Sequence, residues 1–197
     1  MQSGVLHNAD GSARFSSGRT QVLAAVYGPG NSRYSHREQP TRGVVEVVCR
    51  KSSGAPSAAE RTAEAFVGRT LEEAVVVDSY PRKTLCVVLQ VVHDDGGLLA
   101  CLVNAACAAM IDAGVEMNFL PLASTFCAAD DGPFLIDPTA AEEAREGNLV
   151  TVVCESTSSE LVSVEAMGPM APADMAKCAK AAAQIGASLH SIFRSLA

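Results

Sequence analysis

The amino-acid sequence predicts an α+β fold, in which a mixed β-sheet is packed with helices and a long helix ends the chain. Three observations support this prediction. The predicted order is strands, helix, strand, helix, strands, then helix. Some strands pair through turns while others are separated by a single helix, so hairpins and crossovers share the sheet. With 197 residues, 48% of them hydrophobic, the chain suits one domain over 1–197.

Three strands are predicted in the first quarter of the chain. Residues 13–15 and 21–27 flank a Gly- and Ser-containing turn at 16–19, and their β-branched and aromatic residues favour strands. The stretch 28–32, which holds two glycines and a proline, is expected to end the second strand before an Arg-rich loop. Residues 44–49, with the sequence VVEVVC, form the third strand.

A helix is predicted to begin after Ser57, because Ser57 and Glu60 stand at the spacing of a capping box. Apolar residues then recur at helical spacing as far as Ala74. After Pro81 the chain becomes almost continuously apolar over 84–92. This composition favours a strand that is buried on both faces.

An Ala-rich helix is predicted over 98–113, with Gly114 ending it. Residues 120–128 and 134–136 then form a hairpin around the turn 130–133, whose sequence DDGP is a strong turn signal.

The last third predicts a short helix, a second hairpin and the long C-terminal helix. Asp137 fits an N-cap with Pro138 at the first helical position. Residues 150–154 and 161–165 form the hairpin. The final helix is expected to bury one apolar stripe, made of Met175, Cys178, Ala182, Ile185, Leu189, Ile192, Phe193 and Leu196.

Composition excludes several classes of protein. No apolar run reaches the roughly 20 residues that a membrane-spanning helix needs, and no signal peptide is evident, so no membrane partner is expected. The seven cysteines form no Cys-x-x-Cys pair, which argues against a zinc site or a disulfide framework. We therefore expect a soluble protein in a reducing, intracellular compartment.

Charge and motifs alone leave the function open. The net charge is −7, yet residues 14–51 hold seven basic residues against two acidic ones. This basic segment either attracts polyanions or is simply solvated. The sequence has no phosphate-binding P-loop, no nucleophile elbow and no His-Glu-x-x-His motif, and its four histidines are isolated.

Several segments stand in order along nearly the whole chain. They are 9–15 and 18–29 in the opening hairpin, 95–97, 104–106 and 112–117 around the central helix, and the acidic stretch that begins at 135–139. Together these segments resemble the RNase PH family. This resemblance implies an RNase PH-like fold, and within the family the chain looks most like a ring subunit of the RNA exosome.

The resemblance also implies which chemistry is weakened. Phosphorolytic members cut RNA from its 3′ end with inorganic phosphate, which they grip with a Thr-Arg or Ser-Arg pair after Asp-Gly-Gly. Here Leu98 and Leu99 follow instead, which makes the phosphate site degenerate. Loss of one charge-assisted hydrogen bond weakens binding roughly ten- to hundredfold.

The carboxylates of the family's active site are better preserved. Asp137 matches its first catalytic Asp and Glu143 its second, so these two residues are the catalytic candidates and weak metal ligands. The alternative is that Asp137 only caps a helix while Glu143 is solvated. No cofactor is certain, and Mg²⁺ or Mn²⁺ with inorganic phosphate would be needed if the protein is active.

In relatives the loop between the second and third strands faces the RNA path of the ring. The resemblance therefore implies RNA contacts without sequence readout. A helix arginine, either Arg61 or Arg69, is expected to match a further phosphate contact. The RNA-binding candidates are Arg33, Arg37, Arg42, Arg50, Lys51, Arg82 and Lys83.

Three functions remain open at this point. The first is a structural and RNA-guiding exosome subunit that binds single-stranded RNA and other RNase PH-like subunits in the nucleus, nucleolus and cytoplasm. The second is an active nuclease, a phosphorolytic 3′-exoribonuclease or a metal-dependent RNase or DNase, acting as a homodimer. The third is a role unrelated to nucleic acids, because fold alone does not fix function.

Overall fold

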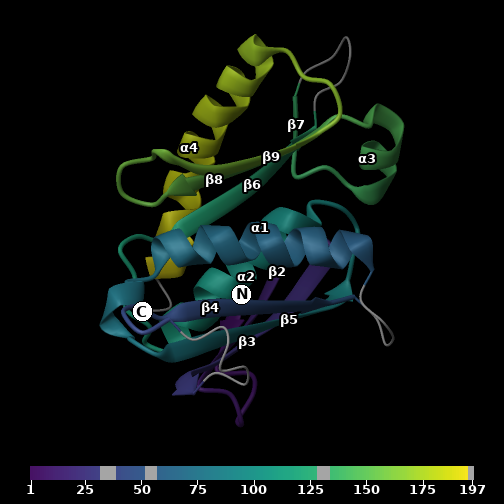
Figure 1. The fold of residues 1–197 in the computed structure, drawn as a ribbon. Coiled ribbons are helices and arrows are strands. Elements are labelled where there is room, and N and C mark those ends of the chain that lie inside the picture. The colour runs from purple at the N-terminus through teal and green to yellow at the C-terminus, as the bar shows by residue number, and fades with distance from the viewer. Residues whose placement is uncertain (32–38, 52–56, 128–133, 195–197) are drawn as a thin grey trace.

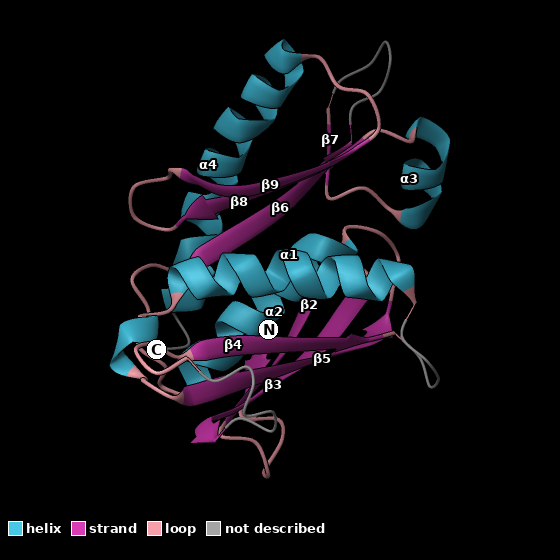
Figure 2. Ribbon diagram, viewed as in Figure 1, coloured by secondary structure: helices cyan, strands magenta, loops and turns pink. Residues whose placement is uncertain are grey.

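The computed structural model describes residues 1–31, 39–51, 57–127 and 134–194. Two β-sheets enclose two helices, and the C-terminal helix packs on the outer face of the second sheet (Figures 1 and 2). The α+β fold with mixed pairing and a long C-terminal helix is confirmed, although the strands form two sheets instead of one.

The first sheet is the mixed one. Strand β4 runs parallel to β5, and all other neighbouring strands of this sheet pair antiparallel. The chain reverses at the β2–β3 hairpin, where Ser17 pairs with Thr20, as the turn sequence predicts. In spatial order the strands are β1 (Gln2–Ser3), β2 (Gly11–Ser17), β3 (Thr20–Asn31), β5 (Lys83–His93) and β4 (Val44–Arg50).

The prediction that 28–32 ends the second strand is wrong. β3 continues to Asn31, and its register against β5 shifts between Tyr27 and Gly30. Gly28 has φ +119, and a Cβ atom there would collide with the carbonyl oxygen of Thr84. The irregularity accommodates a proline without an N–H, so the strand resumes beyond it.

The two helices between the sheets are α1 (Ala58–Ala74) and α2 (Leu98–Asp112), and a short 3-10 helix, η2 (Val77–Ser79), follows α1. The predicted capping box is confirmed, because Glu60 N–H donates to Ser57 Oγ at 3.2 Å and Ser57 N–H donates to Glu60 Oε2 at 2.6 Å. Residues 100–110 of α2 are all buried, since the helix contacts strands of both sheets.

β5 is not buried on both faces, contrary to the prediction. Its side chains alternate, so that Leu85, Val87 and Leu89 are buried while Val92 is 56% exposed. The helices cover one face of the first sheet only, and the apolar residues of the other face remain partly accessible. A continuous apolar run therefore does not guarantee two covered faces.

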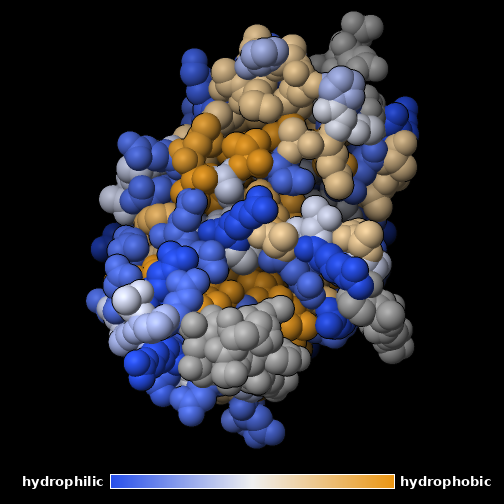
Figure 3. Space-filling model, viewed as in Figure 1, coloured by the Kyte–Doolittle hydropathy of each residue, from blue (hydrophilic) through white to orange (hydrophobic). Residues whose placement is uncertain are grey.

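The second sheet is antiparallel throughout, and the predicted hairpin is confirmed by the pairs Phe126 with Ile136 and Cys127 with Leu135. Its turn, 130–133, lies outside the described residues. Figure 3 shows apolar residues at the level of the β9 edge, above the hydrophilic residues over α1. In spatial order the strands are β7 (Leu135–Ile136), β6 (Pro121–Cys127), β8 (Leu149–Glu155) and β9 (Leu161–Met167).

The C-terminal helix α4 (Pro172–Arg194) buries only part of the predicted stripe. Cys178, Ala182 and Phe193 are buried, and Phe193 stacks on Phe15 with the ring centroids 6.2 Å apart. Met175 is exposed, because the N-terminal end of α4 stands beyond the second sheet (Figure 1). Ile192 is also exposed and Leu196 lies outside the described residues, so the stripe is shorter than predicted.

The short helix α3 (Ala140–Glu146) begins later than predicted. Its N-cap is Thr139, whose N–H and hydroxyl both donate to Glu142 Oε2 at 2.8 Å. The prediction of Asp137 as N-cap is therefore wrong. Thr139 is the N-cap and forms a capping box with Glu142, three residues later.

The main apolar core draws residues from both sheets, for example Ala13 and Leu89 from the first and Leu122 and Val153 from the second. A smaller cluster joins α4 to the second sheet. One domain over 1–197 stays a prediction. None of the helices in the described ranges has the length and hydropathy needed to cross a membrane.

Candidate functional site

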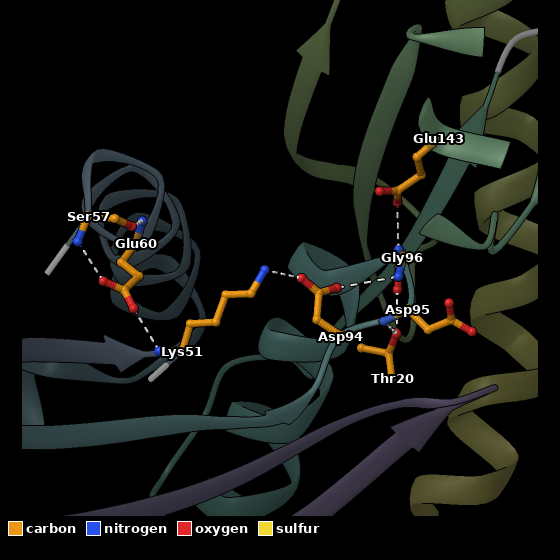
Figure 4. Close-up of polar contacts among 9 residues, drawn as sticks. Thr20, Lys51, Ser57, Glu60, Asp94, Asp95, Gly96 and Glu143 are labelled. Carbon is orange, nitrogen blue, oxygen red and sulfur yellow. Dashed lines mark hydrogen bonds and ion pairs between the residues drawn. The ribbon is translucent and has the colours of Figure 1, made fainter. Parts of the chain in front are cut away.

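Three chain segments meet at the N-terminal end of α2: the start of β3 at Thr20, the loop that holds Asp95 and Gly96, and the segment before α3 (Figure 4). The buried Thr20 hydroxyl donates to Gly96 O at 2.6 Å and accepts the Asp95 N–H at 2.9 Å. Ala140 N–H donates to Asp95 O at 2.8 Å. A Cβ atom at Gly96 would collide with Pro138 O, so only glycine lets the loop lie against the segment before α3.

Asp137 is held in an unusual conformation at this junction. Its φ is +51, a region that costs an L-residue on the order of 1 kcal/mol. Its N–H donates to Thr125 O at 2.9 Å, and its exposed carboxylate accepts a 3.1 Å hydrogen bond from Ser17 Oγ. The alternative that helix capping alone explains Asp137 thus fails, and the carboxylate stays accessible at the edge of the site.

Glu143 reaches the same loop from α3. Its Oε1 accepts the Gly97 N–H at 2.7 Å. Figure 4 shows the Glu143 side chain directed at the loop that holds Asp95 and Gly96. Burial raises the pKa of the Glu143 carboxyl and nearby Asp94 raises it further, whereas the Gly97 N–H and Lys51 oppose the shift. Glu143 is therefore not a solvated surface residue.

Leu98 and Leu99 form the first turn of α2 and are half-buried. A helix N-terminus favours an anion, because its backbone N–H groups point outward and the helix dipole is positive there. At this helix the carboxylate of Glu143 already lies beside the N-cap residue Gly97. An incoming phosphate would meet two aliphatic side chains and a competing carboxylate.

No group of three or more His, Cys, Asp or Glu side chains gathers anywhere in the described ranges. The Asp137 carboxylate accepts a hydrogen bond from Ser17 Oγ, whereas the Glu143 carboxylate accepts the Gly97 N–H. The role of Asp137 and Glu143 as weak metal ligands stays a prediction.

The predicted RNA-binding residues near the site are tied to carboxylates. Lys51 Nζ lies 2.5 Å from Asp94 Oδ2, and Arg50 Nη1 lies 2.9 Å from Glu64 Oε1. Figure 4 shows the Lys51 side chain extended toward Asp94. These ion pairs reduce the charge that each cation can offer to a phosphate.

Arg42, Arg82 and Lys83 lie at the other end of the first sheet. Val44 pairs with Thr84 and Arg50 with Gln90, so β4 separates the two groups by about 20 Å. In the distant group Lys83 Nζ donates to Asn31 Oδ1 at 3.0 Å and Arg42 donates to Gln39. The structure therefore divides the five described RNA-binding candidates between two places.

Two of the seven predicted RNA-binding residues, Arg33 and Arg37, lie outside the described residues. Of the two helix arginines, Arg61 lies in the first turns of α1, next in sequence to Glu60, whose carboxylate accepts the Lys51 N–H at 2.7 Å. Arg69 lies two turns further along and lines a separate cleft with Glu64 and Glu72. A phosphate contact by either arginine stays a prediction.

The sequence did not identify Ser17, Thr20 or Asp94 as parts of the site. Ser17 and Thr20 close a hairpin and Asp94 begins a turn, so their residue types already have a structural explanation. Only their contacts across the fold, to Asp137, Gly96 and Lys51, reveal the second role.

No disulfide joins any of the seven cysteines, all of which lie in the described ranges. Cys101 lies next to the site, where burial raises the pKa of its thiol to about 12. A thiol with such a pKa stays protonated at neutral pH and is a poor nucleophile or metal ligand.

Models of the two halves of one protein family match this chain. The model described as 3′ exoribonuclease family, domain 1, matches residues 1–116, and that for domain 2 matches residues 120–185. An exosome complex exonuclease RRP46 homolog from Arabidopsis thaliana is 39% identical over 154 residues, 78% of this chain and 64% of that protein. The chain thus spans less than two thirds of that relative's length.

This chain matches a larger share of two further proteins. The human exosome complex component RRP41 is 32% identical over 203 residues, which include 96% of this chain and 81% of the human protein. The crystal structure of rice (Oryza sativa) Rrp46 superposes with a TM-score of 0.93 at 31% identity, covering 99% of this chain and 92% of that one. An Archaeoglobus fulgidus exosome with RNA bound to the active site shares the fold, with a TM-score of 0.84 at 21% identity.

Proposed function

The chain belongs to the 3′ exoribonuclease family, and from this premise we propose that it is an RNase PH-like ring subunit of the RNA exosome. In this role it contributes to 3′-to-5′ RNA processing and decay, including rRNA processing and mRNA turnover, mainly by building the ring and guiding RNA. Its partners are other RNase PH-like subunits and single-stranded RNA, with a homodimer in isolation, and its compartments are the nucleus, nucleolus and cytoplasm.

The observation that carries the structural role is the N-terminal end of α2. Leu98 and Leu99 offer neither charge nor hydrogen bond to phosphate, and Glu143 accepts the N–H of Gly97. A phosphorolytic enzyme must bind inorganic phosphate at the scissile bond. Among the described residues, the first turn of α2 offers phosphate no charged or hydrogen-bonding side chain, so the proposed contribution to RNA decay is to hold and orient the strand.

RNA guidance is proposed on the basic residues at the two ends of the first sheet. Such residues contact phosphates without reading the base sequence, and binding weakens as salt rises. Lys51 and Arg50 are partly neutralised, so Arg42, Arg82 and Lys83 are proposed to contribute more of the attraction. Arg33 and Arg37 belong to the same proposal.

A nuclease assay tests this proposal. Purified protein is incubated with labelled poly(A), with and without inorganic phosphate, and with Mg²⁺ or Mn²⁺. We expect no phosphate-dependent release of nucleoside diphosphates. Release that requires phosphate and disappears in Asp137→Asn would overturn the structural role.

A second candidate function is an active nuclease that acts as a homodimer through Asp137 and Glu143. The conformation of Asp137 favours it, because strained residues concentrate at functional sites and helix capping does not explain this one. In the same assay, cleavage that needs a divalent cation but no phosphate, and that is lost in Asp137→Asn but retained in Glu142→Gln, would support this candidate.

Assembly is tested separately by native mass measurement. We expect a dimer for the isolated chain and a mixed ring when other RNase PH-like subunits are added. A protein that stays monomeric alone and also fails to join those subunits would contradict the ring assignment.

A further inference from the structure

A pocket of about 230 Å³ opens between α1, the first turn of α2 and the second sheet. Its walls are mostly aliphatic, with Leu98, Leu99 and Leu102 on one side and Leu149 on another. Apolar cavities of about 150 Å³ can hold benzene, so this volume admits a ring with substituents. Ala63 on α1 is half-buried in the pocket wall, and Met167 is an exposed residue of the lining.

The two charged side chains of this pocket are carboxylates, which only accept hydrogen bonds when ionised, and the Thr62 hydroxyl already donates to Ala58 O at 3.2 Å. Glu143 and Glu165 present carboxylates from α3 and β9. The hydroxyls of Thr125 and Thr151 lie 3.2 Å from each other, so they partly satisfy one another. The N–H of Gly97 already donates to Glu143.

This lining excludes an anion and selects a donor. Among the described residues that line the pocket there is no lysine, arginine or histidine. Two carboxylates repel phosphate, whereas they accept strongly from N–H groups. The aliphatic walls favour a flat, weakly hydrated ring over a fully polar ligand.

We propose that this pocket binds a nucleobase that carries an exocyclic amino group, such as cytosine or adenine, with the ring against the leucines and the amino group directed at Glu143 or Glu165. Cytosine N4 and adenine N6 are amino donors, and a carboxylate is a suitable acceptor for such a group. Uracil carries a carbonyl oxygen where cytosine carries the amine, so its oxygen would face a carboxylate.

The base can come from a free nucleoside or from the 3′ end of an RNA strand. The RNA source rests on the proposed function, because it requires the strand to be delivered to this site. The nucleoside source does not, since the pocket itself makes every contact. Measuring both separates a failure of the pocket from a failure of the RNA role.

Titration of the whole protein by calorimetry or NMR tests the proposal. The probes are cytidine, adenosine, uridine and inorganic phosphate, followed by short single-stranded RNAs that differ only in a 3′-terminal C or U. We expect saturable binding of cytidine and adenosine, about tenfold weaker binding of uridine, and no displacement by phosphate. The C-ended RNA should exceed the U-ended RNA by a similar factor.

Matched variants locate the site. Ala63→Phe fills the pocket from α1, and Ala65→Phe adds the same side chain at an exposed position of that helix outside the pocket. Cytidine binding should be lost in the first variant and kept in the second. Ala59→Phe, at an exposed residue of the pocket, replaces Ala63→Phe if the latter does not fold.

Glu165→Gln tests the acceptor role, because an amide supplies a donor as well as an acceptor. It should reduce the preference for cytidine over uridine. Equal binding of cytidine and uridine by the wild type, or cytidine binding that survives both filling variants, would overturn the pocket. Nucleoside binding without any RNA binding would leave the pocket intact and contradict the RNA role instead.

Discussion

Two neighbouring glutamates of α3 show how position decides the behaviour of identical residues. Glu142 lies in the capping box, where the Thr139 N–H and hydroxyl lower the pKa of its carboxyl. Glu143 points into the fold, where burial raises the pKa of its carboxyl despite the hydrogen bond from Gly97. Ionisation of Glu142 therefore favours the folded state, and ionisation of Glu143 opposes it.

Glu143→Gln should raise the melting temperature at pH 7. A folded pKa above the ordinary value of 4.5 means that the Glu143 carboxyl favours folding below about pH 4.5, and that this contribution is lost as pH rises through the folded pKa. Glutamine keeps the acceptor for Gly97 and removes the charge. Thermal melts at several pH values should show a gain at pH 7 that vanishes near pH 4.

The matched control, Glu142→Gln, should behave in the opposite way. Because the pKa of the Glu142 carboxyl is lowered in the folded protein, the ionised carboxylate stabilises the fold at pH values above its ordinary pKa. This contribution is lost as pH falls through the folded pKa. The variant should melt below the wild type at pH 7, and the difference should close in acid. Equal shifts of the same sign in both variants would contradict the assignment of their environments.

Asp137 permits a test of backbone strain. Asp137→Gly and Asp137→Ala both lose the hydrogen bond from Ser17, yet only glycine adopts φ +51 without steric cost. Urea unfolding should find the alanine variant less stable than the glycine variant by about 1 kcal/mol. Equal midpoints would mean that the loop relaxes around the substitution.

At the level of elements, the C-terminal helix is anchored unevenly. Phe193 is 1% exposed and stacks on Phe15 of β2, which ties the end of α4 to the main core. Phe193→Ala should lower the free energy of unfolding by about 3–5 kcal/mol in urea denaturation. Met175→Ala, at a residue 38% exposed, should cost less than about 1 kcal/mol. A small effect at Phe193 would show that α4 is not held at this end.

The elements that sequence patterns predicted well have strong local signals. The capping box at Ser57, the apolar helix that begins at Leu98 and the hairpin of β6 and β7 each follow from neighbouring residues. One error arises where distant contacts decide, because the apolar composition of β5 cannot show which face of the sheet the helices cover. The error at Asp137 has a local cause, because Thr139 and Glu142 form a capping box that begins two residues later.

The sequence predicted residues of the candidate site, but not their geometry. Leu98, Leu99, Asp137 and Glu143 were identified through resemblance, and their roles stay predictions. That Glu143 contacts the N–H of Gly97 could not follow from sequence, because the two residues are 46 positions apart. The same holds for the ion pair of Lys51 with Asp94, which joins β4 to the loop before α2.

For the whole molecule, salt dependence should distinguish the two basic ends. Arg42→Gln/Lys83→Gln removes two cations that no carboxylate pairs in the described residues. The slope of log affinity for single-stranded RNA against log salt should become shallower by about 1.4, or roughly 0.7 for each phosphate that is no longer neutralised. Arg50→Gln, at the residue paired with Glu64, should change the slope less.

The separation of the basic ends along β4 sets a molecular ruler. An oligonucleotide too short to bridge it can occupy only one end at a time, and the two ends then act as independent weak sites. Once the strand is long enough, binding at the second end becomes intramolecular and affinity increases by the effective concentration. Affinity plotted against chain length should therefore show a step instead of a steady rise, and the length at the step reports the span of the path.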